Sequence, residues 1–175
     1  MNYATIKWTD IANGEGVRIS LFVSGCTHHC KNCFNKIAWD FSYGEPFDAA
    51  VQEKILSALG DDYIAGLSLL GGEPFEPSNQ RALLPFLREV KRRYPQKSVW
   101  AYTGDVLNVE TGMLQKSERN TEATKELVSL IDVLVDGEFV EELKNIRLRF
   151  RGSSNQRVLD VKKSLNAKKP VLYLD

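Results

Sequence analysis

Short apolar segments that end in glycine alternate with amphipathic segments along this chain, and this alternation constrains its fold more than any other feature. Residues 67–70 are nearly all apolar and run into a glycine pair, as expected for a buried parallel strand. Apolar residues recur every four positions over residues 47–59, which predicts an amphipathic helix. Strands that alternate with helices favour right-handed βαβ units around a mostly parallel sheet. We therefore predict an α/β fold.

The same patterns place the other elements. We expect strands at residues 6–10, 17–23, 67–70, 98–103, 131–135 and 146–150, and helices at residues 47–59, 83–94 and 121–130. The polar segment 108–120 shows no period and predicts a loop. Residues 1–157 are expected to form the main domain, and residues 158–175 a C-terminal extension that is either a tail or an added strand.

All three cysteines lie close together, at Cys26, Cys30 and Cys33. Three thiols are an odd number for disulfides and one short of a closed tetrahedral thiolate site. Iron–sulfur clusters usually use four cysteines, so a four-iron cubane on three thiolates keeps one iron without a protein sulfur. The spacing C-x3-C-x2-C therefore indicates a cofactor with an open coordination position.

Two other interpretations of the cysteines stay open at this point. The spacing i, i+4, i+7 is also one face of a helix, where the thiols would be inert core residues. Zinc could take His28 or His29 as a fourth ligand, although structural zinc sites usually pair two knuckles and the chain has no second one. Gly25 and the polar residues around the cysteines favour an exposed loop after a strand.

Length and composition limit the class of protein and the partners to expect. The 175 residues fit one domain, and 23 basic residues balance 23 acidic ones, so net charge gives no reason to expect a nucleic-acid or membrane partner. No apolar stretch approaches the ~20 residues of a membrane helix, and residues 1–10 lack a signal-peptide pattern. We expect a cytoplasmic protein, in which clustered cysteines bind metal or catalyse rather than form disulfides.

A second motif, Gly71-Gly72-Glu73-Pro74, follows the apolar strand at residues 67–70. Alone it is no more than a tight turn after a strand. Together with C-x3-C-x2-C after the first core strand, it makes the chain resemble the radical S-adenosylmethionine superfamily. The resemblance implies a [4Fe–4S] cluster held by Cys26, Cys30 and Cys33, with S-adenosylmethionine on the open iron. It also implies an incomplete, open-sided (βα) barrel of mostly parallel strands.

Within that superfamily, the chain is similar to the glycyl-radical activating enzymes of anaerobic ribonucleoside-triphosphate reductase. The matching segments are residues 13–18, 21–26, 35–36 with Trp39, 102–104, 135–137 with Phe139, and 151–156. Arg-Gly-Ser-Ser-Asn-Gln at residues 151–156 is the most family-specific of them.

The resemblance also implies roles for individual residues. S-adenosylmethionine is expected to contact Asn32, Cys33, Phe34, Gly71, Gly72 and Glu73. Asn32 stands where many superfamily members carry an aromatic residue, and Phe34 is the nearest aromatic. Arg18 and Lys36 face either the site, the partner or solvent. Asp136 is expected to make a turn rather than bind ribose, and residues 151–157 to contact the ligand or the reductase.

The resemblance implies that the protein is an enzyme. Its cofactors are expected to carry out the radical chemistry, and no other catalytic side chain is expected. Its expected partners are the large subunit of the anaerobic reductase, as protein substrate, and a one-electron donor such as flavodoxin. Three alternatives remain: an activase of another glycyl-radical enzyme, a small-molecule radical S-adenosylmethionine enzyme, and a non-enzymatic zinc or iron–sulfur binding module.

Overall fold

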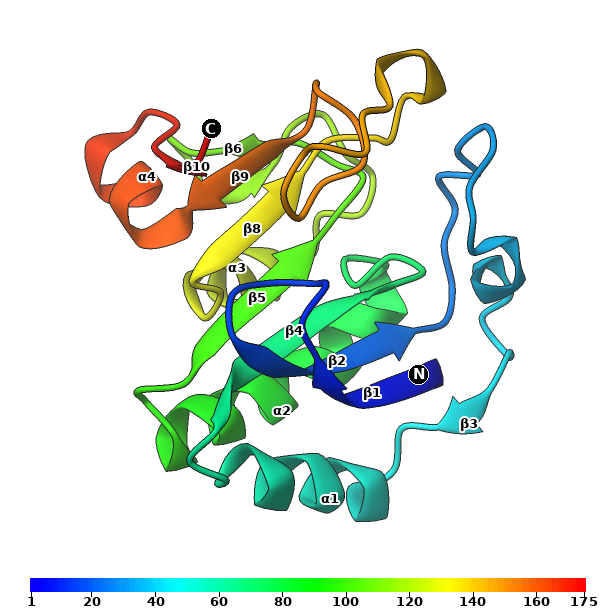
Figure 1. Cartoon of the computed structure of the whole chain (residues 1–175), viewed down its shortest axis with the longest axis vertical. Coiled ribbons are helices and arrows are strands. Elements are labelled where there is room, and N and C mark those ends of the chain that lie inside the picture. The colour runs from blue at the N-terminus through cyan, green and yellow to red at the C-terminus, as the bar shows by residue number, and fades with distance from the viewer.

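The computed structural model describes all 175 residues and is built around one eight-stranded sheet (Figure 1). The strand order across the sheet is β10-β9-β8-β5-β4-β2-β1-β3. The bounds are β1 Asn2–Asp10, β2 Val17–Val23, β3 Glu45–Pro46, β4 Ile64–Gly71, β5 Ser98–Tyr102, β8 Val133–Asp136, β9 Arg157–Asp160 and β10 Leu172–Leu174. The α/β class expected from the sequence is thereby confirmed.

The prediction of a mostly parallel sheet is wrong, because the sheet is mixed. Strands β2, β4, β5 and β8 pair in parallel, but β1 and β3 on one side and β9 and β10 on the other pair antiparallel. The loop at residues 11–16 is too short for a parallel crossover, so β1 and β2 form a hairpin. The sheet is an open row with β10 and β3 at its two edges.

Helices cover one face of this sheet. They are α1 Ala49–Leu59, α2 Pro77–Arg93, α3 Thr124–Ser129 and α4 Val161–Ala167, and Figure 1 shows α1 and α2 along the lower side of the sheet. The main core contains 29 buried residues from these helices and from alternate positions of the strands. In β2 the core residues are Ile19, Leu21 and Val23, whereas Arg18 and Ser20 point to the other face.

Loops border the opposite face, where Trp100 is the largest buried side chain. Trp100 packs with Val133, Val135 and Val158, and its ring meets the edges of Phe150 and Tyr173. The hydroxyl of Tyr173, near the C-terminus, donates to Glu15 Oε2 at 2.6 Å. The C-terminal segment is therefore attached across this face to the loop that precedes β2.

One expected strand is absent, and two other segments agree with expectation. Residues 146–150 were expected to form a strand, which is wrong, because Ile146 is 92% exposed and Phe150 has φ +60° within a series of turns. The strand is β9, which runs back along β8. Residues 158–175 contain most of β9, α4 and β10, so the added strand exists. The 108–120 segment is a loop with only the small strands β6 Leu107–Asn108 and β7 Met113–Leu114 at or near its start.

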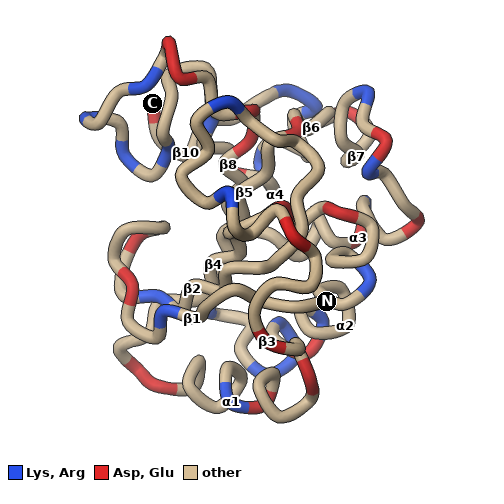
Figure 2. The backbone as a smooth tube through the Cα atoms, turned by 90° about the vertical axis from the view of Figure 1, so that its right-hand side faces the viewer, with Lys and Arg blue, Asp and Glu red and all other residues tan.

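Charges of both signs are interspersed along the chain, as Figure 2 shows. None of the helices has the length and apolar character needed to cross a bilayer.

Candidate functional site

The cysteine loop leaves the sheet at the C-terminal end of β2. Gly25 has φ +98°, a conformation that favours glycine, and any Cβ there would collide with the ring of Phe41. The 3-10 turn η1, Lys36–Trp39, closes the loop, because Gly25 N–H donates to Ala38 O at 2.8 Å and Cys26 N–H to Trp39 O at 3.2 Å. The loop is thus a closed unit with fixed ends rather than a helix face.

The Gly71-Gly72-Glu73-Pro74 turn lies directly beside this loop. Strands β2 and β4 are parallel neighbours with Val23 opposite Gly71, so their C-terminal ends meet at one edge. Glu73 N–H donates to Gly25 O at 2.8 Å, and Gly72 N–H donates to Val23 O at 2.8 Å. A Cβ on Gly72 would lie 2.5 Å from Gly25 O. The glycine at position 72 therefore lets the two loops pack against each other.

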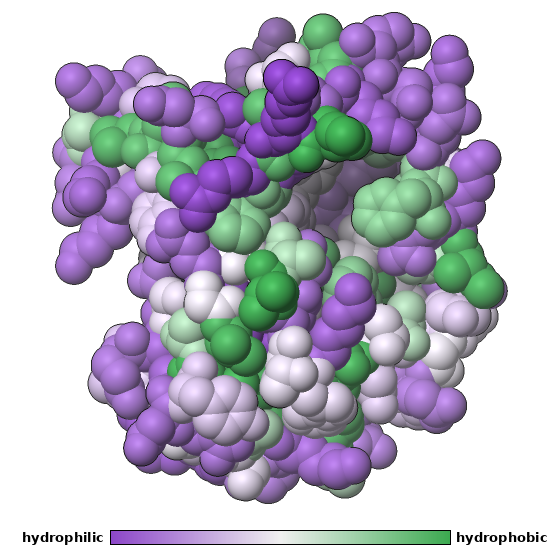
Figure 3. Space-filling model, viewed as in Figure 1, coloured by the Kyte–Doolittle hydropathy of each residue, from purple (hydrophilic) through white to green (hydrophobic).

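The three cysteines open into one cavity of about 170 Å³. Its other lining residues include Phe34, Gly71, Gly72 and Glu73, so the structure brings together five of the six residues expected to contact S-adenosylmethionine. Asn32 lines an adjoining cavity of about 490 Å³, which shares Cys30, Cys33 and Phe34 with the first. Figure 3 shows the hollow on this face with hydrophobic side chains at its edge.

The three thiols are not gathered as ligands of one metal ion would be. Ligands around a single zinc lie about 3.8 Å apart, given Zn–S bonds of about 2.3 Å. The three sulfurs do not converge within 4.8 Å of one another; the group that does is His28, Glu73 and Asp105. In addition, Asn35 N–H donates to Cys33 Sγ at 3.4 Å, a contact that stabilises a thiolate ligand.

Burial controls the protonation of the free thiols. It raises the pKa of Cys26 to about 11 and, together with the negative charge of Glu138, that of Cys30 to about 12. These two thiols are therefore protonated at neutral pH until a metal displaces the protons.

One residue that lines both cavities carries a buried polar atom without a partner. The hydroxyl of Tyr102 makes no hydrogen bond in the protein, and the charged groups that act on it are Arg18 and Asp10. The fit to a cluster therefore rests on the chemistry of the donor set, which is three thiols beside an open cavity with one position left for a polar ligand.

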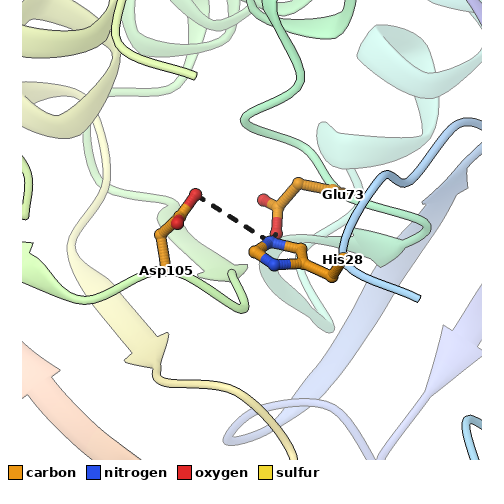
Figure 4. Close-up of side chains that lie close together, drawn as sticks. All are labelled: His28, Glu73 and Asp105. Atoms are coloured by element: carbon orange, nitrogen blue, oxygen red, sulfur yellow. Dashed lines mark hydrogen bonds and ion pairs between the residues drawn. The ribbon is translucent and has the colours of Figure 1, made fainter. Parts of the chain in front are cut away.

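Glu73 is fully engaged with the protein. Its side chain is 1% exposed, Oε2 lies 2.7 Å from His28 Nε2 and accepts from Gly104 N–H at 2.9 Å, and Oε1 accepts from Phe75 N–H at 2.9 Å. Burial alone would lower the pKa of His28, but its hydrogen bond to Glu73 raises that pKa overall. Figure 4 shows the His28 ring between Glu73 and Asp105. Glu73 thus ties the cysteine loop to the end of β5.

Several other residues singled out in the sequence are structural. Arg18 lies at the opposite end of the strands, 1% exposed, and bonds neutral oxygens of Ser68, Ser98, Leu67 and Glu15. The exposed Lys36 ammonium lies over the ring of Trp39. Neither cation faces the cavity of the cysteines.

Residues 151–157 form hydrogen bonds that stabilise their own loop. Gln156 Oε1 accepts from the N–H groups of Gly152 and Ser153, and its amide donates to Gly137 O. Asp136 is 1% exposed and forms an ion pair with Arg157. Of this segment, only Gln156 lines the 170 Å³ cavity.

Further lining residues lie at the ends of β5 and β8, in segments that matched the family but were given no ligand contact from the sequence. They are Tyr102, Thr103, Gly104, Gly137 and Phe139. Gln156 also lines the cavity, and it belongs to the segment 151–157 that was expected to contact the ligand or the reductase. The glycines after predicted strands were the available signal, because ligands bind at the carboxyl ends of parallel strands.

The chain matches a family model and several curated relatives. A family model described as a 4Fe-4S single cluster domain matches residues 12–159. The anaerobic ribonucleoside-triphosphate reductase-activating protein of Haemophilus influenzae is 44% identical over 158 residues, covering 89% of this chain and 96% of the relative. The protein of that name from Escherichia coli K12 is 41% identical over 160 residues (90% and 97%), and that of Enterobacteria phage T4 is 35% identical over 162 residues (90% and 93%).

Proposed function

This chain belongs to the family of anaerobic ribonucleoside-triphosphate reductase-activating proteins, and from that premise we propose that it installs a glycyl radical on such a reductase. The observation that carries the proposal is the single cavity into which Cys26, Cys30 and Cys33 open beside the Gly71-Gly72 turn. Three thiols at the carboxyl ends of parallel strands provide a cluster site with one position left for a ligand.

The chain's contribution is to hold and orient the cofactors. Cys26, Cys30 and Cys33 would bind a [4Fe–4S] cluster. A bound cluster would supply the electron that breaks the sulfonium C–S bond of S-adenosylmethionine, giving methionine and a 5′-deoxyadenosyl group able to take a hydrogen atom from a backbone glycine of the reductase. The surrounding loops would orient the cofactors in the cavity, which is the usual share of the protein in cofactor chemistry.

We further propose that S-adenosylmethionine lies across both cavities. Cys33, Phe34, Gly71 and Gly72 would border its methionyl end, and Asn32 its adenosyl end in the larger cavity. Glu73 would act by holding His28 and Gly104 in place and by bordering the ligand.

The reductase large subunit would dock over the larger cavity. Large apolar side chains stand exposed there, with Phe34 95%, Ile146 92% and Ile11 74% exposed. Phe34 and Ile146 line the cavity of about 490 Å³, and Ala12 and Asn13 bring the segment of Ile11 to its edge. Exposed apolar groups around a cavity mark a protein contact surface. A flavodoxin-type protein in the cytoplasm would supply the electron.

Anaerobic reconstitution followed by electron spin resonance tests the proposal. The reconstituted protein should contain about four irons and four sulfides per chain. Reduction with S-adenosylmethionine and the reductase should then produce a glycyl radical signal. Cofactor cleavage without that radical would point to another substrate, and one tightly held zinc in a colourless protein would refute the cluster.

Two variants probe the docking surface. Ile11→Asp and Ile146→Asp should weaken activation of the reductase at least tenfold. Basal cleavage of S-adenosylmethionine by Ile11→Asp should stay unchanged, because Ile11 lines neither cavity. Ile37→Asp, at a side chain that is 58% exposed outside both cavities, is the matched control. Equal activation by the Ile146 and Ile37 variants would exclude this surface.

A further inference from the structure

Arg119, from the polar loop at residues 108–120, reaches the first residue after Cys26. Its Nη2 donates to Thr27 Oγ1 at 2.6 Å, and its Nε donates to Glu76 Oε1 at 3.0 Å. The same Glu76 oxygen accepts from Thr27 N–H at 2.7 Å and from Thr27 Oγ1 at 2.6 Å. Thr27, Glu76 and Arg119 are therefore mutually bonded, and together they hold the start of the cysteine loop.

The other side of the guanidinium faces a second carboxylate. Arg119 Nη1 lies 3.3 Å from Asp105 Oδ2, and Asp105 lies 3.8 Å from His28 Nε2. His28 in turn contacts Glu73 at 2.7 Å, as Figure 4 shows for these three side chains. Glu73, Glu76 and Asp105 are all largely buried, with side chains 1%, 4% and 12% exposed. Arg119 is the only arginine or lysine that forms an ion pair with any of these three carboxylates.

The backbone of Arg119 is held by a buried side chain. Its carbonyl accepts from Gln80 Nε2 at 2.7 Å, and Gln80 is fully buried at the start of α2, where the same amide donates to Phe75 O. A charged group held by packed neighbours acts with less reorganisation than a mobile surface charge.

We propose that Arg119 is a positioning residue of the cluster site, which fixes the loop that starts at Cys26 and offsets the charge of the three carboxylates beside it. This inference rests on the proposed function. Reduction adds one negative charge to a cluster already held by thiolates. A nearby cation stabilises the reduced form, so Arg119 raises the reduction potential, and each carboxylate lowers it.

Substitutions of opposite sign test this role. Arg119→Gln should lower the reduction potential of the reconstituted cluster, and Asp105→Asn should raise it, as measured by redox titration with electron spin resonance. A purely structural role would not shift the potential in opposite directions. Arg119→Lys keeps the charge but lacks the planar guanidinium whose three nitrogens bond Thr27, Glu76 and Asp105 at once. It should therefore restore most of the potential with faster loss of cluster. Thr27→Val should speed cluster loss without a change of potential.

Arg88→Gln is the matched control, because Arg88 is 55% exposed and pairs with Glu126 on the outer surface of α2. It should behave as the unsubstituted protein. If Arg119→Gln and Asp105→Asn both keep the original potential, the inference is overturned. Should Arg119→Gln fail to fold, the result for Asp105→Asn decides, since an unchanged or lower potential refutes it. Absence of any cluster in the unsubstituted protein would instead refute the proposed function.

Discussion

Gly72→Ala should detach the Gly71-Gly72-Glu73-Pro74 turn from the cysteine loop. The added Cβ would lie 2.5 Å from Gly25 O and 2.9 Å from Ala38 O. Both contacts are with backbone atoms, which cannot rotate away as the end of a side chain can. The two loops must therefore separate, and this strains the hydrogen bonds from Glu73 N–H to Gly25 O and from Gly25 N–H to Ala38 O, each 2.8 Å long.

The size of the effect follows from those two bonds. A buried hydrogen bond contributes about 0.5–1.5 kcal/mol net, and a buried group left without a partner costs about 1–3 kcal/mol. Loss of both bonds with partial access of water gives a decrease of about 2–4 kcal/mol in the free energy of unfolding. Because domains are stable by about 5–15 kcal/mol, the variant should still fold.

Urea unfolding of the cluster-free protein measures the loss of stability. Iron content after reconstitution measures the loss of cluster binding. Gly60→Ala is the matched control, since Gly60 has φ −71° and its nearest neighbour is the terminal hydroxyl of Tyr94 at 3.0 Å. It should cost less than about 1 kcal/mol. Gly72→Ala should lose stability and also hold less iron. If it keeps both and loses only S-adenosylmethionine binding, the glycine serves the ligand and the packing argument is refuted.

Three further outcomes follow from the site and the sheet. Cys26→Ser, Cys30→Ser and Cys33→Ser should each lose most of the cluster and its visible absorbance; full iron content in any one would remove that residue from the ligand set. In cluster-free protein, the rate of alkylation of Cys30 should keep rising from pH 8 to pH 10. The reason is that the pKa of Cys30 is raised to about 12, so the thiolate fraction grows throughout this range. A rate that levels off near pH 8 contradicts this prediction. Arg18→Met should lower the free energy of unfolding by about 2–4 kcal/mol, since carbonyls such as Leu67 O lose their donor, and should leave iron content unchanged.

The position of the site could be predicted from the sequence because it depends on local signals. An apolar strand followed by glycines identifies a buried parallel strand, and the carboxyl ends of such strands share one edge. The loop of Cys26 and the turn of Gly72 accordingly lie together, as Val23 and Gly71 are paired across β2 and β4.

What could not be predicted depends on contacts between distant segments. Strand β9 has only two buried residues, Val158 and Leu159, and so short a pattern does not show the direction of a strand. Residues 146–150 alternate between apolar and polar but form turns instead. Arg119 lies in a segment without period, and its partner Thr27 is 92 residues away. Likewise, no local sequence pattern shows that the Glu73 carboxylate contacts His28 and accepts a hydrogen bond from Gly104.

The bond between Tyr173 and Glu15 has a consequence for how the chain is made. These two residues are 158 positions apart, and β10 can pair with β9 only after residues 172–174 have left the ribosome. Contacts of such long sequence separation form late and slow folding. The aromatic face around Trp100 therefore stays open during synthesis until Tyr173 has emerged. We expect nascent chains that stop before residue 172 to be protease-sensitive along β9, and extension through residue 175 to remove that sensitivity.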